Sequence, residues 1–96
     1  MTPSPQLSGP DIQTVWARIA DHAGQTFRTI TGLEFTYEVP GAYLRVSRTV
    51  RNLSQSNFGK ALAQMPAASP AVLRDRQGAS YTWAILTDDR IRAGQW

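Results

Sequence analysis

The segment LEFTYEVPGAYLRV, residues 33–46, carries the strongest structural pattern in this sequence. Apolar and polar residues alternate on both sides of Pro40-Gly41, which is the period-two pattern of half-buried strands. Proline presets φ for a turn and glycine accepts a positive φ. We therefore expect an antiparallel hairpin with a two-residue turn, whose cross-strand pairs are Val39–Ala42, Tyr37–Leu44 and Phe35–Val46. This pairing places the apolar side chains of both strands on one face.

The opposite face of the predicted hairpin is polar. The same register places Glu38 opposite Tyr43 and Thr36 opposite Arg45. Arg45 then lies diagonally close to Glu34 and Glu38, within reach of a long side chain. We expect these two glutamates to offset part of the charge of Arg45.

A helix and a short strand are predicted before the hairpin. Apolar residues spaced three and four apart indicate a helix over residues 10–23. Pro10 suits its first position, with Ser8 or Gly9 as the cap, and Gly24 suits its end. Residues 26–30 are expected to form a short first strand.

Helices are predicted after the hairpin as well. Ser54 is expected to cap a second helix, with Leu53 and Phe58 as its hydrophobic staple, and Pro66 ends that helix. One helical turn is possible within residues 70–77. Ser80 is expected to cap a shorter third helix, and Asp88-Asp89 to begin a turn.

The expected fold class is α+β. Its order is an N-terminal helix, a two- or three-stranded antiparallel hairpin or meander, a second helix and a shorter C-terminal helix. Ninety-six residues suit a single small domain, residues 1–96. Within it we expect residues 1–9 to be a flexible leader and residues 93–96 to be frayed.

The composition argues against several classes of function. The chain has no cysteine and one histidine, His22, so thiolate and multi-histidine metal sites within one chain are excluded. Glu34 and Glu38 would be roughly 13 Å apart along a strand, too far for a glycosidase pair, which needs at most about 9.5 Å. No phosphate-binding glycine motif is present. We expect a non-enzymatic protein without cofactor or metal. No apolar run is long enough for a membrane span, and a cytoplasmic location is expected.

The positive charge is concentrated in the middle of the chain. Residues 39–77 hold six basic residues and a single acidic one, Asp75, whereas the segments on either side are neutral or slightly acidic. A basic segment of this kind is a candidate surface for an anionic partner.

Part of this segment suggests a nucleic-acid site. The candidate residues run from the end of the hairpin through a polar loop into the second helix, and they are Arg45, Arg48, Arg51, Asn52, Ser54, Gln55 and Lys60. The start of a helix offers unpaired N–H groups to a phosphate, and arginine adds charge-assisted contacts. Polar side chains there can reach phosphates or base edges. Tyr43, directed outward, can stack on an exposed base.

Two other interpretations remain open. In the first, Ser54 only caps its helix, Arg45 pairs with Glu34 or Glu38, and the other arginines are solvated. In the second, the chain is an accessory or inhibitor-like protein that binds an acidic protein partner. Exposure of both Trp83 and Trp96 would favour the second hypothesis, since tryptophan anchors interfaces. A homodimer is also compatible with the sequence.

Overall fold

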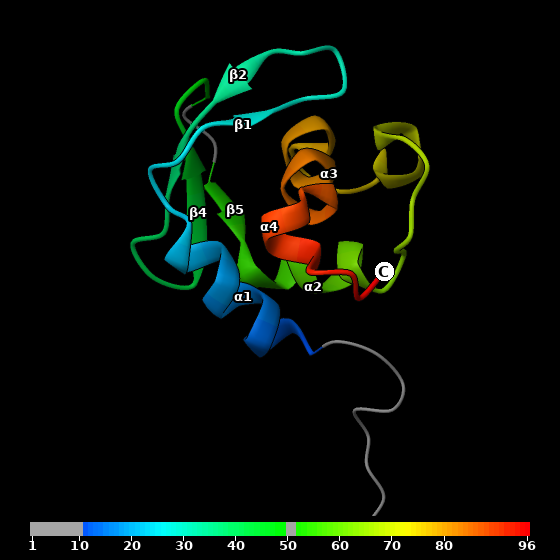
Figure 1. The fold of residues 1–96 in the computed structure, drawn as a ribbon, viewed down its shortest axis with the longest axis horizontal. Coiled ribbons are helices and arrows are strands. Elements are labelled where there is room, and N and C mark those ends of the chain that lie inside the picture. The colour runs from blue at the N-terminus through cyan, green and yellow to red at the C-terminus, as the bar shows by residue number, and fades with distance from the viewer. Residues whose placement is uncertain (1–10, 50–51) are drawn as a thin grey trace, which may run out of the picture.

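The computed structural model describes residues 11–49 and 52–96 and gives an α+β fold (Figure 1). The predicted order of an N-terminal helix, antiparallel strands and then further helices is confirmed. In chain order the elements are α1 (Ile12–Asp21), β1 (Phe27–Arg28), β2 (Glu34–Phe35), β3 (Tyr37–Glu38), β4 (Tyr43–Val46), β5 (Asn52–Ser54), α2 (Gln55–Leu62), the 3-10 turn η2 (Pro70–Leu73), α3 (Ala79–Thr87) and α4 (Asp89–Arg92). The predicted leader, residues 1–9, and the candidate Arg51 lie outside the described residues.

The first helix starts later than predicted. Asp11 has an extended backbone and caps α1, since its side chain accepts a hydrogen bond from the N–H of Gln13 at 3.3 Å. The helix therefore begins at Ile12, after the predicted start, while the predicted first residue, Pro10, and the predicted caps, Ser8 and Gly9, lie outside the described residues. Asp is itself among the strongest N-cap residues, so the helix can begin beside it without an earlier cap.

Fewer residues of α1 are fully buried than its apolar pattern predicts. Val15 and Ile19 are fully buried, while Ile12 and Trp16 are half-buried against the core. The Trp16 ring meets Phe58 of α2 edge-on, with centroids 5.5 Å apart. The helix therefore packs along the line from Val15 to Ile19.

Residues 34–38 form an extended segment that belongs to two sheets. Its first half, β2, pairs with β1, and its second half, β3, begins the three-stranded sheet β3-β4-β5, all antiparallel. Thr36 joins the halves, because its C=O accepts from the N–H of Ser47 at 2.9 Å and its N–H donates to Ser47 Oγ at 3.0 Å. The segment thus has hydrogen-bonding neighbours on both sides.

The hairpin register differs from the predicted one by two residues. Tyr37 lies opposite Val46 and Glu38 opposite Arg45, so the predicted pair Tyr37–Leu44 is wrong. The connection is wider than a two-residue turn, in keeping with the poor match of type II turns to hairpin twist. A shift of two preserves the faces of a strand, and the predicted apolar face is indeed buried, with Phe35, Tyr37, Leu44 and Val46 at most 3% exposed.

A strand replaces part of the predicted polar loop. Residues 52–54 form β5, in which Leu53 lies opposite Leu44 and both are fully buried. The N–H of Gln55 donates to the C=O of Ala42 at 2.8 Å and continues the ladder. One apolar residue between two polar ones is too short a pattern to identify a strand in a sequence.

The start of α2 follows the prediction. Ser54 caps it, with Oγ accepting from the N–H of Asn57 at 3.0 Å. Leu53 and Phe58, the predicted staple, are both fully buried. The predicted helical turn before Gly78 is also present, as η2.

The C-terminal part departs from the prediction in three places. Gly78, with φ +58°, precedes α3, so Ser80 lies inside that helix and does not cap it. Asp88 caps α4, a helix in place of the predicted turn, by accepting from the N–H of Arg90 at 2.9 Å. Trp96 is half-buried and its indole N–H donates to the C=O of Leu86 at 2.7 Å, so the end of the chain is packed where fraying was expected.

The helices cover one face of the three-stranded sheet. Figure 1 shows α4 and α3 to the right of β4 and β5, with α1 at the lower end of these strands and next to α4. The fully buried side chains come from both layers: Leu44 and Leu53 from the sheet, and Phe58, Ile85, Leu86 and Ile91 from the helices. The other face of the sheet carries the polar residues.

A buried amide links α2 to the start of α3. Asn57 is 8% exposed. Its Oδ1 accepts from the N–H of Gln77 at 3.0 Å, and its Nδ2 donates to the C=O of Gln77 at 3.1 Å and to Thr82 Oγ1 at 3.3 Å. Thr82, fully buried, donates its hydroxyl to the same C=O at 3.1 Å. The Asn57 amide thus pairs with the backbone of Gln77 as a neighbouring strand would.

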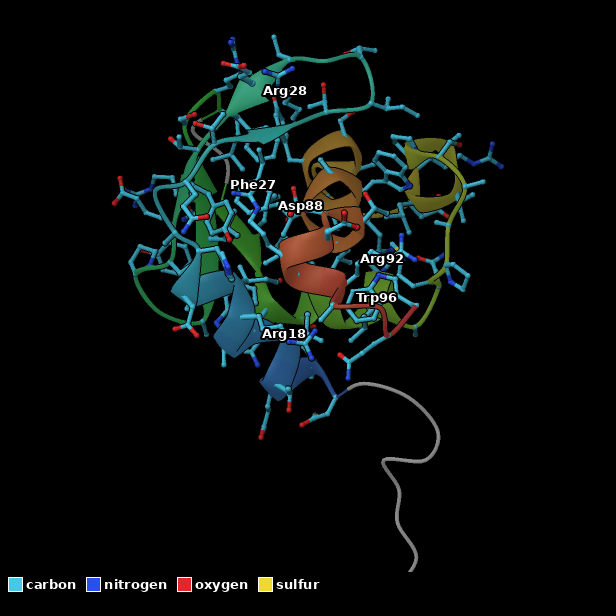
Figure 2. The ribbon with its side chains drawn as sticks, viewed as in Figure 1. Arg18, Phe27, Arg28, Asp88, Arg92 and Trp96 are labelled. Carbon is cyan, nitrogen blue, oxygen red and sulfur yellow. The ribbon has the colours of Figure 1, made fainter. Side chains whose placement is uncertain are left out.

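A second polar cluster holds α4 against β1. Arg90 donates to both carboxylate oxygens of Asp88 at 2.8 and 2.9 Å and lies 3.9 Å above the Phe27 ring. It also donates to the C=O of Thr26 at 2.8 Å. Figure 2 shows Phe27 and Asp88 close together in this region.

Nearby, the hydroxyl of Tyr37 donates to the C=O of Ile19 at 2.6 Å, and burial raises the pKa of that hydroxyl.

Replacing Asn57 by alanine is expected to lower the free energy of unfolding by about 2–3 kcal/mol, because the Gln77 N–H loses its acceptor, and the Gln77 C=O and the Thr82 hydroxyl keep only the hydrogen bond between them. Urea unfolding of Asn57→Ala measures this loss, with the exposed Gln64→Ala as the control. Equal midpoints for the two variants would contradict the assigned role of the amide.

Alanine at Gly78 is expected to destabilise more than alanine at Gly24. Both glycines have positive φ, +58° and +88°, so each variant has the left-handed strain of about 1–2 kcal/mol. A Cβ at Gly78 would lie 2.8 Å from Leu53 Cδ2, whereas one at Gly24 meets no atom within 4 Å. The Gly78→Ala variant should lose about 1–3 kcal/mol more in urea unfolding. Equal losses would show that the contact with Leu53 relaxes freely.

Acid is expected to weaken the fold through Asp88. The hydrogen bonds from Arg90 hold the pKa of Asp88 below its ordinary value of 3.8. Its contribution to stability is therefore present above pH 3.8 and is lost as the pH falls below it. Asp88→Asn keeps a capping side chain but should show lower stability at neutral pH and a shallower decline on acidification. Thermal unfolding against pH tests this, with the exposed Asp89→Asn as the control; an unchanged pH profile for Asp88→Asn would exclude the linkage.

Candidate nucleic-acid interface

The structure divides the predicted site residues among three places. Arg45, Asn52 and Ser54 lie together on the solvent-facing side of the three-stranded sheet. Gln55 and Lys60 line a groove beside α2, which Ser54 also borders. Arg48 follows β4, and Arg51 lies outside the described residues. The predicted residues therefore do not form one continuous anion site.

The sheet register brings one group of these residues together. Across β4 and β5, Arg45 lies opposite Asn52 and Tyr43 opposite Ser54. Arg45, Asn52 and Ser54 are exposed and Tyr43 is half-buried, whereas Leu44, Val46 and Leu53 between them are buried. Alternate residues of a strand share a face, so the four side chains form a patch on the outer surface. We call Tyr43, Arg45, Asn52 and Ser54 the outer-face patch.

A shallow recess adjoins this patch. It has a volume of about 460 Å³ and is bordered by Arg45 and Asn52 together with Thr36, Glu38 and Ser47. Its border combines one cation, Arg45, and one carboxylate, Glu38, with hydroxyl and amide groups. Thr36 and Ser47 were not among the predicted site residues, although the predicted register placed Thr36 opposite Arg45. In the structure Glu38 takes that position, and Thr36 bonds to Ser47 instead.

Arg45 lies opposite one of the two glutamates expected to offset part of its charge, but it forms no ion pair with either among the described residues. Glu34 forms an ion pair with Arg28 at 2.7 Å, so it is not the partner of Arg45. Glu38 lies directly opposite Arg45, yet none of the ion pairs found within residues 11–49 and 52–96 involves Arg45. Its guanidinium is exposed and can accept an external anion in competition with Glu38.

Arg48 has a structural contact. Its Nε donates to the C=O of Glu34 at 2.5 Å, beyond the point where β4 ends. The residue remains exposed, and the terminal nitrogens of a guanidinium can still donate to another group. Arg48 can therefore bind an anion only from a position fixed by the backbone of β2.

The start of α2 offers less to an anion than expected. The N–H of Gln55 donates to Ala42 and that of Asn57 to the capping hydroxyl of Ser54. Two of the first N–H groups of the helix are therefore already bonded, and Ser54 uses its hydroxyl as an acceptor there. The expectation of several unpaired donors at this helix end is wrong.

The side chains of Trp83 and Trp96 are hydrogen-bonded to main-chain groups of the fold. The indole N–H of Trp83 donates to the C=O of Ala67 at 2.9 Å, and that of Trp96 is bonded to Leu86. Both rings are half-buried. Because neither Trp83 nor Trp96 is fully exposed, these side chains do not add the support for the protein-interaction hypothesis that full exposure would give.

Comparisons of the chain with models of protein families, with curated proteins and with solved structures gave no match. In the part of the chain that the structure describes, no helix is both long enough and apolar enough to cross a membrane.

Proposed function

We propose that this chain is a non-enzymatic binding module that holds single-stranded nucleic acid on its outer-face patch. The observation that supports this most is the register of β4 and β5, which places side by side on an open sheet surface an aromatic ring, an amide and a guanidinium that forms no ion pair with a described residue. Each supplies one kind of contact that nucleic acid requires.

The three contacts follow from the chemistry of the side chains. Tyr43 presents a ring on which a base can stack, an interaction that every base can make. Arg45 provides charge-assisted hydrogen bonds to a phosphate. Asn52 carries both a donor and an acceptor, and these can pair with a base edge.

A single strand fits this surface better than a duplex. The bases of a duplex are stacked on one another and are reached through grooves that admit a helix or a two-stranded ribbon. A sheet face with helices packed behind it cannot enter such a groove. Unstacked bases, in contrast, can lie flat against Tyr43.

The proposal predicts weak binding that depends on salt. If Arg45 and Arg48 each neutralise one phosphate, the log of the binding constant against the log of salt concentration should have a slope of about −1.4, at about −0.7 per phosphate for single strands. Fluorescence anisotropy with labelled oligothymidine and oligouridine over a salt series measures this slope. No binding of either probe by micromolar protein at about 50 mM salt would refute the proposal.

Single substitutions test each proposed contact with the oligonucleotide separately. Arg45→Ala should weaken binding and reduce the slope by about 0.7, whereas Arg74→Ala, which removes an exposed arginine away from the sheet, should change neither. Tyr43→Ala should weaken binding about five- to 150-fold through lost stacking, and Tyr43→Phe should retain it. Equal effects of Arg45→Ala and Arg74→Ala would mean that only net charge matters and that the outer-face patch is not the site.

A further inference from the structure

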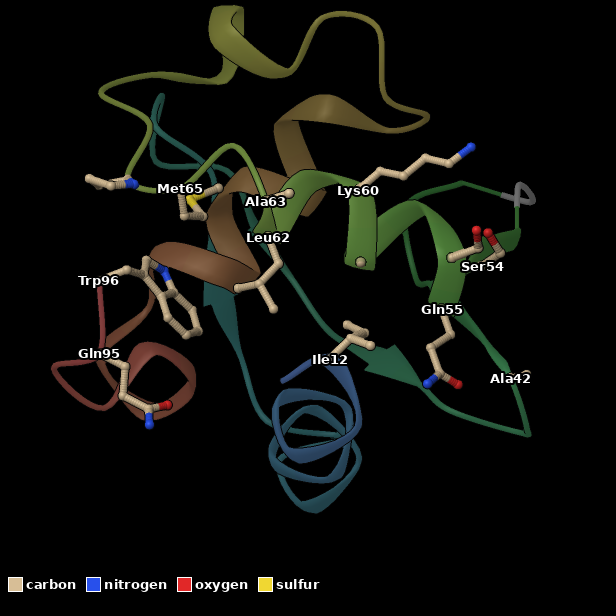
Figure 3. Close-up of a pocket in the computed structure, with 13 residues that line it drawn as sticks. Ile12, Ala42, Ser54, Gln55, Lys60, Leu62, Ala63, Met65, Gln95 and Trp96 are labelled. Atoms are coloured by element: carbon tan, nitrogen blue, oxygen red, sulfur yellow. The ribbon is translucent and has the colours of Figure 1, made fainter. Parts of the chain in front are cut away.

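A second surface of the molecule has the form of a peptide-binding groove. It lies between the start of α1, the outer side of α2 and the C-terminal residues, as Figure 3 shows. Ile12, Leu62, Met65 and Trp96 border it. All four pack against the core yet remain half-buried, so each leaves part of its apolar surface in the groove.

The size of the groove indicates the kind of ligand. Its volume is about 1100 Å³, above the range of about 300–1,000 Å³ usual for small-molecule pockets. In Figure 3 the apolar side chains follow one another from Trp96 past Leu62 to Ile12, and Gln55 continues the line. A linear apolar track of this kind suits several successive side chains of a peptide.

Positive charge stands at both ends of the track. Lys60 borders it near Gln55. At the Trp96 end, Arg92 donates to the main-chain oxygen of Trp96, and Arg18 donates to the C=O of Ile91 and to the side-chain oxygen of Gln95. Neither arginine lines the groove, but each is bonded to a residue that does, and Figure 2 labels Arg18, Arg92 and Trp96 in this part of the fold. The ion pairs found among the described residues involve none of these three cations.

Acidic groups near the groove are fewer. Asp11 precedes Ile12 and is engaged as the cap of α1. The groove lining itself includes Lys60 and no aspartate or glutamate among the residues that the structure describes. Complementary charge on a ligand would therefore be negative, which favours encounter with acidic partners.

We propose that this groove binds a segment of a partner protein in which large apolar side chains are flanked by aspartate or glutamate. The apolar side chains lie along Ile12, Leu62 and Trp96, and the carboxylates face Lys60 at one end and Arg18 and Arg92 at the other. The site is separate from the outer-face patch except at Ser54, and it does not depend on the proposed nucleic-acid function.

The test is selection of linear random peptides displayed on phage against the full chain, followed by anisotropy with the selected peptides in synthetic form. The expected peptides combine leucine, isoleucine, phenylalanine or tryptophan with aspartate or glutamate. Two substitutions at the groove should weaken their binding about tenfold or more. Lys60→Glu reverses the charge at one end, and Ala63→Glu places a carboxylate at an exposed position of the lining.

Matched controls make the same changes elsewhere. Arg74→Glu and Ala71→Glu lie at exposed positions outside the groove and should leave peptide affinity within about twofold. Urea unfolding of all four variants shows whether each is folded. Tyr43→Ala should lower oligonucleotide binding and leave peptide binding intact, so failure of either proposal is distinguishable from failure of the other.

Three outcomes would overturn the proposal. One is the absence of enriched peptides, and another is enrichment of basic sequences. The third is peptide binding that folded Lys60→Glu and Ala63→Glu proteins retain in full. Binding of an acidic peptide that both groove variants weaken and both controls preserve would support it.

Discussion

The paired hydrogen bonds between the Asn57 side chain and the Gln77 backbone connect the strand-containing half of the chain to its last two helices. Residues 63–78 hold only one short turn of regular structure, so the position of α3 depends on where that segment is fixed. The Asn57 amide fixes it one residue before Gly78, whose backbone lies against Leu53 of β5. The α3 helix follows directly, and its buried residues Thr82, Ala84, Ile85 and Leu86 pack into the core beside this contact.

The sequence predicted much of the fold because its strongest signals are local. The alternation around Pro40-Gly41 identified the buried face of the strands, and Ser54 with Leu53 and Phe58 identified the start of α2. The hairpin register was wrong because the same faces result when pairing shifts by two residues. β5 and α4 were missed because three or four residues carry too little periodicity. The packed C-terminus depends on the contact of Trp96 with Leu86, which no local pattern encodes.

The candidate site was harder to predict than the fold. Arg45 and Asn52 are seven positions apart and become neighbours only through the observed pairing of β4 and β5. Lys60 follows Ser54 closely in sequence, but the turn into α2 directs it to the groove instead. Nearness along the chain therefore grouped residues that belong to two surfaces of different chemistry. One is an open polar sheet face, and the other is an apolar groove between cations.

The hydrogen bond from Arg48 to the backbone of Glu34 has a consequence for self-association. Where β4 turns away, the C=O of Glu34 would otherwise be open to the N–H of an added strand from another molecule. A guanidinium occupies that position, and the Arg28–Glu34 ion pair stands beside it. A strand that approached the C=O of Glu34 would have to displace the Arg48 guanidinium and desolvate charged groups, which costs free energy. Pairing of a strand from another molecule at the junction of the two small sheets is therefore disfavoured, and so is the aggregation that follows from such pairing.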